Sequence, residues 1–150
     1  MSHLPDTSFL YSLYRRQVNS PRAIAFMQAL EGPLRVSSLT LLEFRQSIRF
    51  QIRLRSIDHG KGFSKVEATG MLRDLQSDLA GGVLLVGPAD WVDVHRLAEE
   101  LSAKYTEASG HRLIDILHVA TAVYLGAEEF LTFDSNQKLL AENEGLKVPL

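Results

Sequence analysis

The chain has 150 residues, of which 45% are hydrophobic and 23% are charged, and its formal net charge is −2. This composition is that of an ordinary globular domain, long enough to bury a core without covalent or metal crosslinks. The absence of cysteine excludes disulfides, thiolate metal sites and cysteine nucleophiles. No apolar run is long enough to span a membrane and the N-terminus lacks a signal-peptide pattern, so we expect a cytoplasmic protein with no membrane segment.

Hydrophobic periodicity and turn residues predict strands and helices that alternate along the chain. In chain order we expect a strand over 2–5, helices over 7–17 and from 21 to about 31, a strand over 34–37, helices over 39–56 and 64–79, a strand over 83–86, helices over 90–107 and 113–125, a strand over 129–133, a helix over 135–142 and an edge strand at 147–148. Strands separated by helices indicate a mostly parallel sheet covered on both faces. We find no repeat or long linker, which predicts one α/β domain over residues 1–150.

Four acids fall where the chain passes between strands and helices. Asp6 and Asp134 follow the first strand and the strand over 129–133, Glu43 lies early in the helix over 39–56, and Asp115 lies in the first turn of an apolar helix. Parallel α/β sheets bind ligands at the carboxyl ends of their strands. Acids crowded at one such edge are unfavourable unless a cation joins them, and Mg²⁺ prefers oxygen ligands of this kind. The pattern therefore predicts a magnesium or manganese site.

Each acid also has a purely structural interpretation. Asp6 and Asp134 are in position to cap the helices that follow them, and Asp134 has Gln137 three residues later, as in a capping box. Thr40 and Glu43 have the same spacing, and Asp115 is favourably placed near a helix N-terminus. It is the four acids together, more than any one of them, that favour a metal site.

Basic residues are concentrated in the first half of the chain. Residues 1–73 contain 11 Lys or Arg and 5 Asp or Glu, whereas residues 74–150 contain 5 and 13. Arg45, Arg49 and Arg53 recur every four residues along one helix face and are candidates for binding RNA phosphates, although a solvated helix face gives the same pattern. His118 follows Asp115 by three residues in the apolar helix, where we expect a buried structural histidine with no catalytic role.

The same residues resemble the motifs of a known family. The segments Leu113-Ile-Asp-Ile-Leu-His-Val-Ala-Thr-Ala-Val and Phe130-Leu-Thr-Phe-Asp, with Asp6-Thr-Ser-Phe-Leu and Ser-Leu-Thr-Leu-Leu-Glu43-Phe, resemble PIN-domain nucleases, and in particular the VapC-type toxins. The resemblance covers nearly the whole chain in motif order and spacing.

That resemblance implies a fold and an activity. The fold is a three-layer α/β/α PIN-like domain with a mostly parallel sheet of four to five strands, and the activity is endonucleolytic cleavage of RNA with Mg²⁺ or Mn²⁺. It assigns the metal site to Asp6, Glu43, Asp115 and Asp134 and makes Thr7 and Thr132 supporting hydroxyls. It also implies a small antitoxin as partner and a homodimer. The short first strand, with Pro5 at its end, departs from the longer apolar strand of the family.

The sequence is also compatible in part with two other classes of protein. A phosphatase of the haloacid dehalogenase type needs a second aspartate two residues after the first, where this chain has Ser8, and a receiver domain needs an acidic pair and a late lysine that are not visible. A non-catalytic PIN-like module that binds RNA or protein is the alternative from another functional class. Thermal stabilisation by Mn²⁺ distinguishes it from a nuclease, because a ligand that binds the folded state raises the melting temperature.

Overall fold

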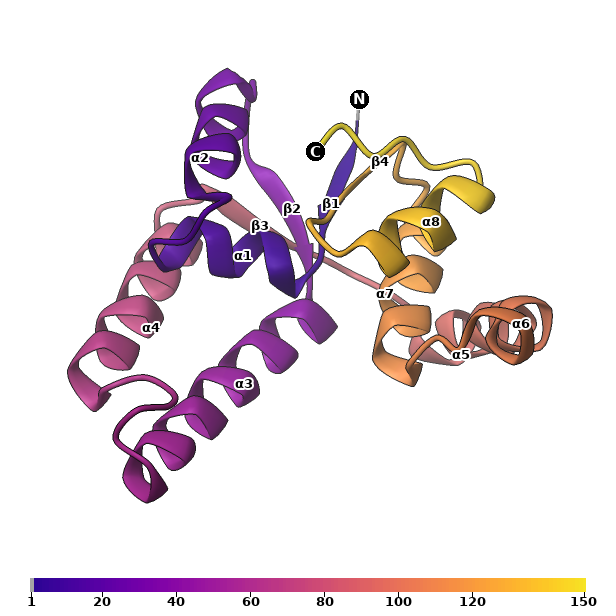
Figure 1. Ribbon diagram of the computed structural model, residues 1–150. Coiled ribbons are helices and arrows are strands. Elements are labelled where there is room, and N and C mark those ends of the chain that lie inside the picture. Colours follow the sequence, from indigo (N-terminus) through magenta and orange to yellow (C-terminus); the bar gives the residue numbers. More distant parts are fainter. Residues whose placement is uncertain (1) are drawn as a thin grey trace.

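The computed structural model describes residues 2–150 and places parallel strands between two groups of helices (Figure 1). The strands are β1 (His3–Pro5), β2 (Leu34–Ser37), β3 (Leu84–Gly87) and β4 (Glu129–Leu131). The helices are α1 (Thr7–Tyr14), α2 (Ser20–Ala29), α3 (Ser38–Ile57), α4 (Lys65–Ala80), α5 (Trp91–Leu101), α6 (Glu107–Ser109), α7 (Leu113–Tyr124) and α8 (Ser135–Asn143), and a π-helical segment, η1 (Ser102–Thr106), joins α5 to α6. The predicted order of strands and helices is thus confirmed from β1 to α8.

The four strands form a parallel arrangement in the order β3-β2-β1-β4. β1 pairs with β4, with Pro5 opposite Leu131, and β2 pairs with β3, with Ser37 opposite Gly87. β1 and β2 lie side by side in the middle of this order. Continuous backbone hydrogen bonding is confined to the pairs β1-β4 and β2-β3. The predicted edge strand at 147–148 is reduced to a single parallel bridge between Glu129 and Lys147.

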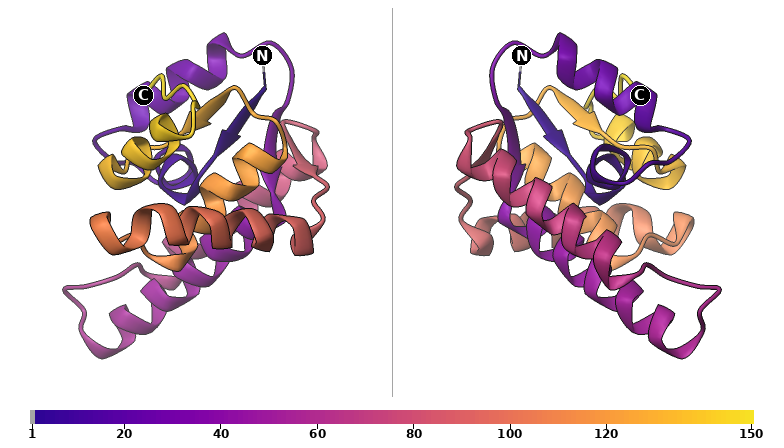
Figure 2. Two further views of the ribbon diagram at one scale, coloured as in Figure 1. Left: turned by 90° about the vertical axis from the view of Figure 1, so that its right-hand side faces the viewer. Right: turned by 90° about the vertical axis from the view of Figure 1, so that its left-hand side faces the viewer.

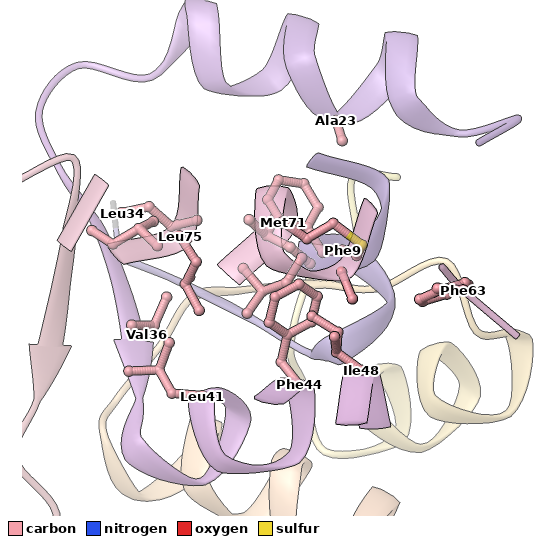
Figure 3. Packing of buried hydrophobic residues seen from close by; sticks show 14 residues of the cluster. Phe9, Ala23, Leu34, Val36, Leu41, Phe44, Ile48, Phe63, Met71 and Leu75 are labelled. Atoms are coloured by element: carbon pink, nitrogen blue, oxygen red, sulfur yellow. The ribbon is translucent and has the colours of Figure 1, made fainter. Parts of the chain in front are cut away.

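Hydrophobic side chains form one cluster on each side of the strands. The first cluster lies among α1, α2, α3 and α4, where Phe9, Phe44 and Met71 occupy its centre (Figure 3). The second lies among α5, α7 and α8. Successive residues of β4 serve opposite clusters, Phe130 the second and Leu131 the first, because side chains alternate along a strand. Figure 2 shows α5 and α7 on one side of the molecule and α4 on the other, so the predicted three-layer α/β/α architecture is confirmed.

Local hydrogen bonds explain where several helices begin and end. The Ser37 hydroxyl caps α3 by accepting from the Thr40 N–H at 3.0 Å. The helix expected over 7–17 ends at Tyr14, because the backbone of Arg15 is extended. The Ser20 hydroxyl holds this conformation by donating to the Arg15 carbonyl at 3.0 Å. The helix expected over 90–107 is α only to Leu101 and then widens into η1.

The turn between α3 and α4 requires glycine at position 62. Gly62 has a φ of +67°, and a Cβ atom there would lie 2.0 Å from the carbonyl oxygen of Gln51. The next residue, Phe63, donates its N–H to the same carbonyl at 3.2 Å and packs into the first cluster. Any other residue at position 62 would therefore push α4 away from α3. Among residues 2–150 no helix is both long and apolar enough to cross a membrane.

Candidate active site

Two of the four acids lie together at the carboxyl ends of β1 and β4. Asp6 follows β1 directly, and its N–H donates to the Leu131 carbonyl at 3.0 Å, which extends the pairing of the two strands by one residue. Thr132 and Asp134 come just after β4 on the same edge. β1 and β4 are hydrogen-bonded neighbours although they are not consecutive strands of the chain, and such a change of direction in the strand order is where α/β proteins bind ligands.

Asp6 is the centre of a buried hydrogen-bond network. Its side chain is 0% exposed. Oδ1 accepts from the Ser8 hydroxyl at 2.6 Å and from the Phe9 N–H at 3.1 Å. Oδ2 accepts from the Thr132 hydroxyl at 2.6 Å and from Gln137 Nε2 at 2.8 Å. These four bonds use all the acceptor positions of the carboxylate. Burial raises the pKa of Asp6, and the hydrogen bonds from Ser8, Thr132 and Phe9 only partly oppose that rise.

Thr132 connects Asp6 to Asp134. Its buried hydroxyl donates to Asp6 and accepts from the Asp134 N–H at 3.0 Å. Asp134 in turn caps α8, accepting at Oδ1 from the N–H groups of Asn136 at 2.8 Å and Gln137 at 3.0 Å. The capping interpretations of Asp6 and Asp134 are therefore confirmed. The predicted capping box of Asp134 and Gln137 is wrong, because the Gln137 side chain bonds to Asp6 and not to the backbone N–H of Asp134.

Glu43 reaches the edge from α3, where it contacts the ring of His118. Glu43 Oε2 is hydrogen-bonded to His118 Nε2, and His118 Nδ1 lies 3.4 Å from the Thr40 hydroxyl, which donates to the Pro5 carbonyl at 3.3 Å. Burial opposes ionisation of Glu43, but the hydrogen bond and positive charge of His118 outweigh it and lower the Glu43 pKa. The capping box of Thr40 and Glu43 is wrong, because α3 begins earlier and Ser37 caps it.

Asp115 lies in the first turn of α7 and is 5% exposed. The Arg112 guanidinium holds it with two bonds, Nε to Oδ2 at 3.0 Å and Nη2 to Oδ1 at 3.3 Å. This hydrogen-bonded charge raises the pKa of Arg112, and the negative charges of Asp134 and Glu43 raise it further. Three of the four acids therefore act electrostatically on one guanidinium, while the charge of His118 acts on Asp6. Direct bonds thus form three groups, Asp6–Thr132–Asp134, Asp115–Arg112 and Glu43–His118, and long-range charge connects the groups with one another.

The four acids are not arranged around a common position for a metal ion. Among residues 2–150 no three His, Asp or Glu side chains lie close enough to ligate one ion. The donor chemistry nevertheless fits a hard divalent cation, because the edge offers carboxylate oxygens and already holds positive charge at Arg112. Thr7, expected as a supporting hydroxyl, is buried near Glu43 and helps lower its pKa. The Thr7 hydroxyl has no hydrogen-bond partner within the described residues.

The three arginines of the predicted RNA-binding face follow α3 away from this edge. Arg49 and Arg53 are exposed and Arg45 is half-buried. Within residues 2–150 none of the three forms an ion pair with a site acid. Their place on α3 leaves a basic helix face next to the acidic edge, as expected from the two-residue offset between Glu43 and Arg45.

Sequence reasoning missed three contributors to the edge. His118 is buried, as predicted, at 1% exposure, but it also orients Glu43. Arg112 stands three residues before Asp115, and this spacing was the available signal for their ion pair. The position of Gln137 three residues after Asp134 suggested only a capping box and gave no signal for its bond to Asp6. For Arg112 the signal is weak, because such i, i+3 pairs are common on helix surfaces.

Comparisons with known proteins place this geometry in a family. The model of the PIN domain matches residues 4–143. Among solved structures the chain is similar to VapC20 of Mycobacterium tuberculosis, with 14% identity, a TM-score of 0.68 and coverage of 92% of this chain and 94% of that one. It is also similar to FitAcB of Neisseria gonorrhoeae (18% identity, TM-score 0.65, coverage 97% and 95%) and to a toxin–antitoxin complex of Klebsiella pneumoniae (17%, 0.64, 99% and 98%).

No curated protein matches the sequence significantly. The structural likenesses are below 25% identity and speak for the fold alone, whereas the family model spans nearly all of the chain. The order of the strands and the acids at their carboxyl ends agree with that match. The chain therefore belongs to the PIN domain family.

Proposed function

We propose that the protein is a metal-dependent endoribonuclease that hydrolyses RNA phosphodiester bonds and acts as the toxin of a toxin–antitoxin pair. The observation that carries the proposal is the placement of the acids: Thr132 joins Asp6 to Asp134 at the carboxyl ends of β1 and β4, and the charges of Asp115, Asp134 and Glu43 all act on the Arg112 guanidinium. Carboxylates that lie near one another disfavour each other's ionised form, and a bound cation relieves that repulsion. PIN-family membership supports nuclease chemistry as the use of that site.

Glu43, Asp115, Asp134 and Asp6 would hold Mg²⁺ or Mn²⁺. A bound ion of this kind lowers the pKa of a water molecule and neutralises charge on the phosphate under attack. The protein's own part is to fix the acids: Thr132 holds Asp6 and the backbone of Asp134, and His118 holds Glu43. Because Asp6 already accepts four hydrogen bonds, it can ligate the ion only if one donor, such as the Gln137 amide, withdraws.

The substrate and partner follow from charge and from the related structures. Arg45, Arg49 and Arg53 supply the positive face that RNA phosphates need. VapC20 is described as a toxin that cleaves the sarcin–ricin loop, and several related structures are toxin–antitoxin complexes, including VapBC2 of Rickettsia felis. We propose by analogy that this chain binds RNA and a small antitoxin and forms a homodimer.

The test is cleavage of a structured RNA pool by purified protein in Mn²⁺, Mg²⁺ or EDTA, with analysis of the new RNA ends. The proposed mechanism requires no protein nucleophile, and water activated at the metal is the expected attacking group. Cleavage should therefore need the metal and leave no 2′,3′-cyclic phosphate, the product expected when the RNA 2′-hydroxyl attacks instead. Cleavage that persists in EDTA, or that leaves cyclic phosphate, would contradict the proposal.

One observation favours the non-catalytic alternative, a PIN-like module that binds RNA or protein. Each acid is already satisfied by a protein group, and Asp6 has no free acceptor position. The two functions differ in their response to Mn²⁺. A metal site raises the melting temperature by mass action, by an amount equivalent to about 2.7 kcal/mol when Mn²⁺ is at 100 times its Kd, whereas a module without a site shows no shift.

A further inference from the structure

Arg112 differs from the other side chains that bond to the site acids, because it is largely exposed to solvent. Its side chain is 73% exposed, while the Asp115 carboxylate that it holds is almost buried. Arg112 is the N-cap residue of α7, and its side chain makes no capping hydrogen bond to the helix. The guanidinium therefore contributes charge to Asp115 without supporting the backbone of the helix.

The bond between Arg112 and Asp115 is easy to exchange. Because the Arg112 guanidinium is open to solvent, screening and the lost entropy of its long side chain weaken its ion pair with Asp115. The hydrogen bonds on Asp6 differ, since Ser8, Thr132 and Gln137 hold it inside the protein with no exposed oxygen. A dication competing for the edge would displace Arg112 before it displaced any donor of Asp6.

We propose that Arg112 is an exchangeable internal cation: it neutralises Asp115 in the metal-free protein, leaves when a divalent ion binds, and then contacts a phosphate of the RNA. The inference rests on the proposed function and adds a residue to it. It also accounts for the lack of convergence among the acids, because Arg112 draws Asp115 toward itself. A guanidinium released beside the site is suited to a phosphate, whose oxygens it can bind in pairs.

The first test measures Mn²⁺ affinity by calorimetry on metal-stripped protein. Arg112→Met removes the competing cation and keeps much of the side chain's length. We expect Mn²⁺ to bind about 3- to 10-fold more tightly, from the loss of a weak ion pair and of a positive charge near a dication. Arg96→Met is the matched control, because Arg96 pairs with Asp93 three residues away on the exposed face of α5. It should leave the affinity unchanged.

The second test measures RNA cleavage at saturating Mn²⁺ for the same variants and for Arg112→Lys. Loss of a charged hydrogen bond to phosphate should raise the KM for RNA about tenfold or more in Arg112→Met. Arg112→Lys should recover part of that loss, since it keeps the charge without the paired donors. Tighter metal binding combined with weaker RNA binding is a result that a misfolded variant does not give.

Several results would overturn the inference. Unchanged or weaker Mn²⁺ binding by Arg112→Met would mean that Arg112 stays on Asp115 or assists the metal, and an unchanged KM would remove the phosphate contact. Either result leaves the proposed nuclease intact if the wild type binds Mn²⁺ and cleaves RNA. Failure of the wild type and both methionine variants to bind Mn²⁺ would instead refute the metal site and the exchange together.

Discussion

Replacing Thr132 with valine tests the hydrogen-bond network that holds the acidic edge. The hydroxyl is buried, donates to Asp6 at 2.6 Å and accepts from the Asp134 N–H at 3.0 Å. A hydrogen bond to a charged group contributes about 1.5–3 kcal/mol and a neutral one about 1 kcal/mol, so Thr132→Val should destabilise the protein by roughly 2–4 kcal/mol. At about 2–4 °C per kcal/mol for a chain of this size, the melting temperature should fall by roughly 5–15 °C.

The matched control is Thr121→Val in α7. Thr121 is also fully buried, but its hydroxyl donates to the neutral Leu117 carbonyl of its own helix at 2.7 Å. Its replacement should cost less than about 1 kcal/mol, because that carbonyl keeps its helical position and no carboxylate loses a donor. Urea unfolding at pH 7 measures both variants. Equal losses for Thr132→Val and Thr121→Val would refute the idea that the Asp6 network stabilises the fold.

Three further predictions concern pH and salt. The Tyr14 hydroxyl donates to Asp78 at 2.6 Å, and burial together with this bond raises the Tyr14 pKa above 10.0, so that its contribution to stability is present below pH 10 and is lost as the pH rises. In urea unfolding between pH 9 and 11, wild type should therefore lose about 1.4 kcal/mol of stability per pH unit above 10, a loss that Tyr14→Phe should not show. The lowered pKa of Glu43 gives the opposite pH dependence: its contribution to stability is present above pH 4.5 and is lost as the pH falls through the folded-state pKa. Glu43→Gln should therefore flatten the loss of stability at acid pH, and an unaltered loss would count against the interaction of Glu43 with His118. Arg49→Ala combined with Arg53→Ala should reduce the slope of log affinity for RNA against log salt by about one to two, and an unchanged slope would exclude both from phosphate contact.

The order of the strands and the place of the acids were predictable because both depend on local pattern. Alternating apolar segments and turn residues locate β1 and β4, and parallel strands necessarily bring Asp6 and Asp134 to one edge. The capping roles of these two residues were equally visible, because a cap depends only on the helix that follows. Their chemical interpretation needed all four acids together.

The contacts made across the fold were not predictable. His118 lies on an apolar helix face, and only the packing of α7 against the start of α3 shows that its ring meets Glu43. Gln137 reaches Asp6 across 131 residues of sequence, in competition with the local capping box that its spacing suggests. The π-helical widening after Leu101 leaves no clear signal in the hydrophobic period.

The measurement that tests the central claim most directly is RNA cleavage by wild type and Asp115→Asn under identical Mn²⁺ concentrations. Asp93→Asn is the control, because Asp93 is also an acid in a helix's first turn paired with an arginine, but its hydrogen bonds are with Asp90 and Arg96 and not with a site acid. We predict metal-dependent cleavage by wild type and Asp93→Asn and none by a folded Asp115→Asn. Undiminished cleavage by Asp115→Asn would contradict the assignment of the acidic edge as the nuclease site.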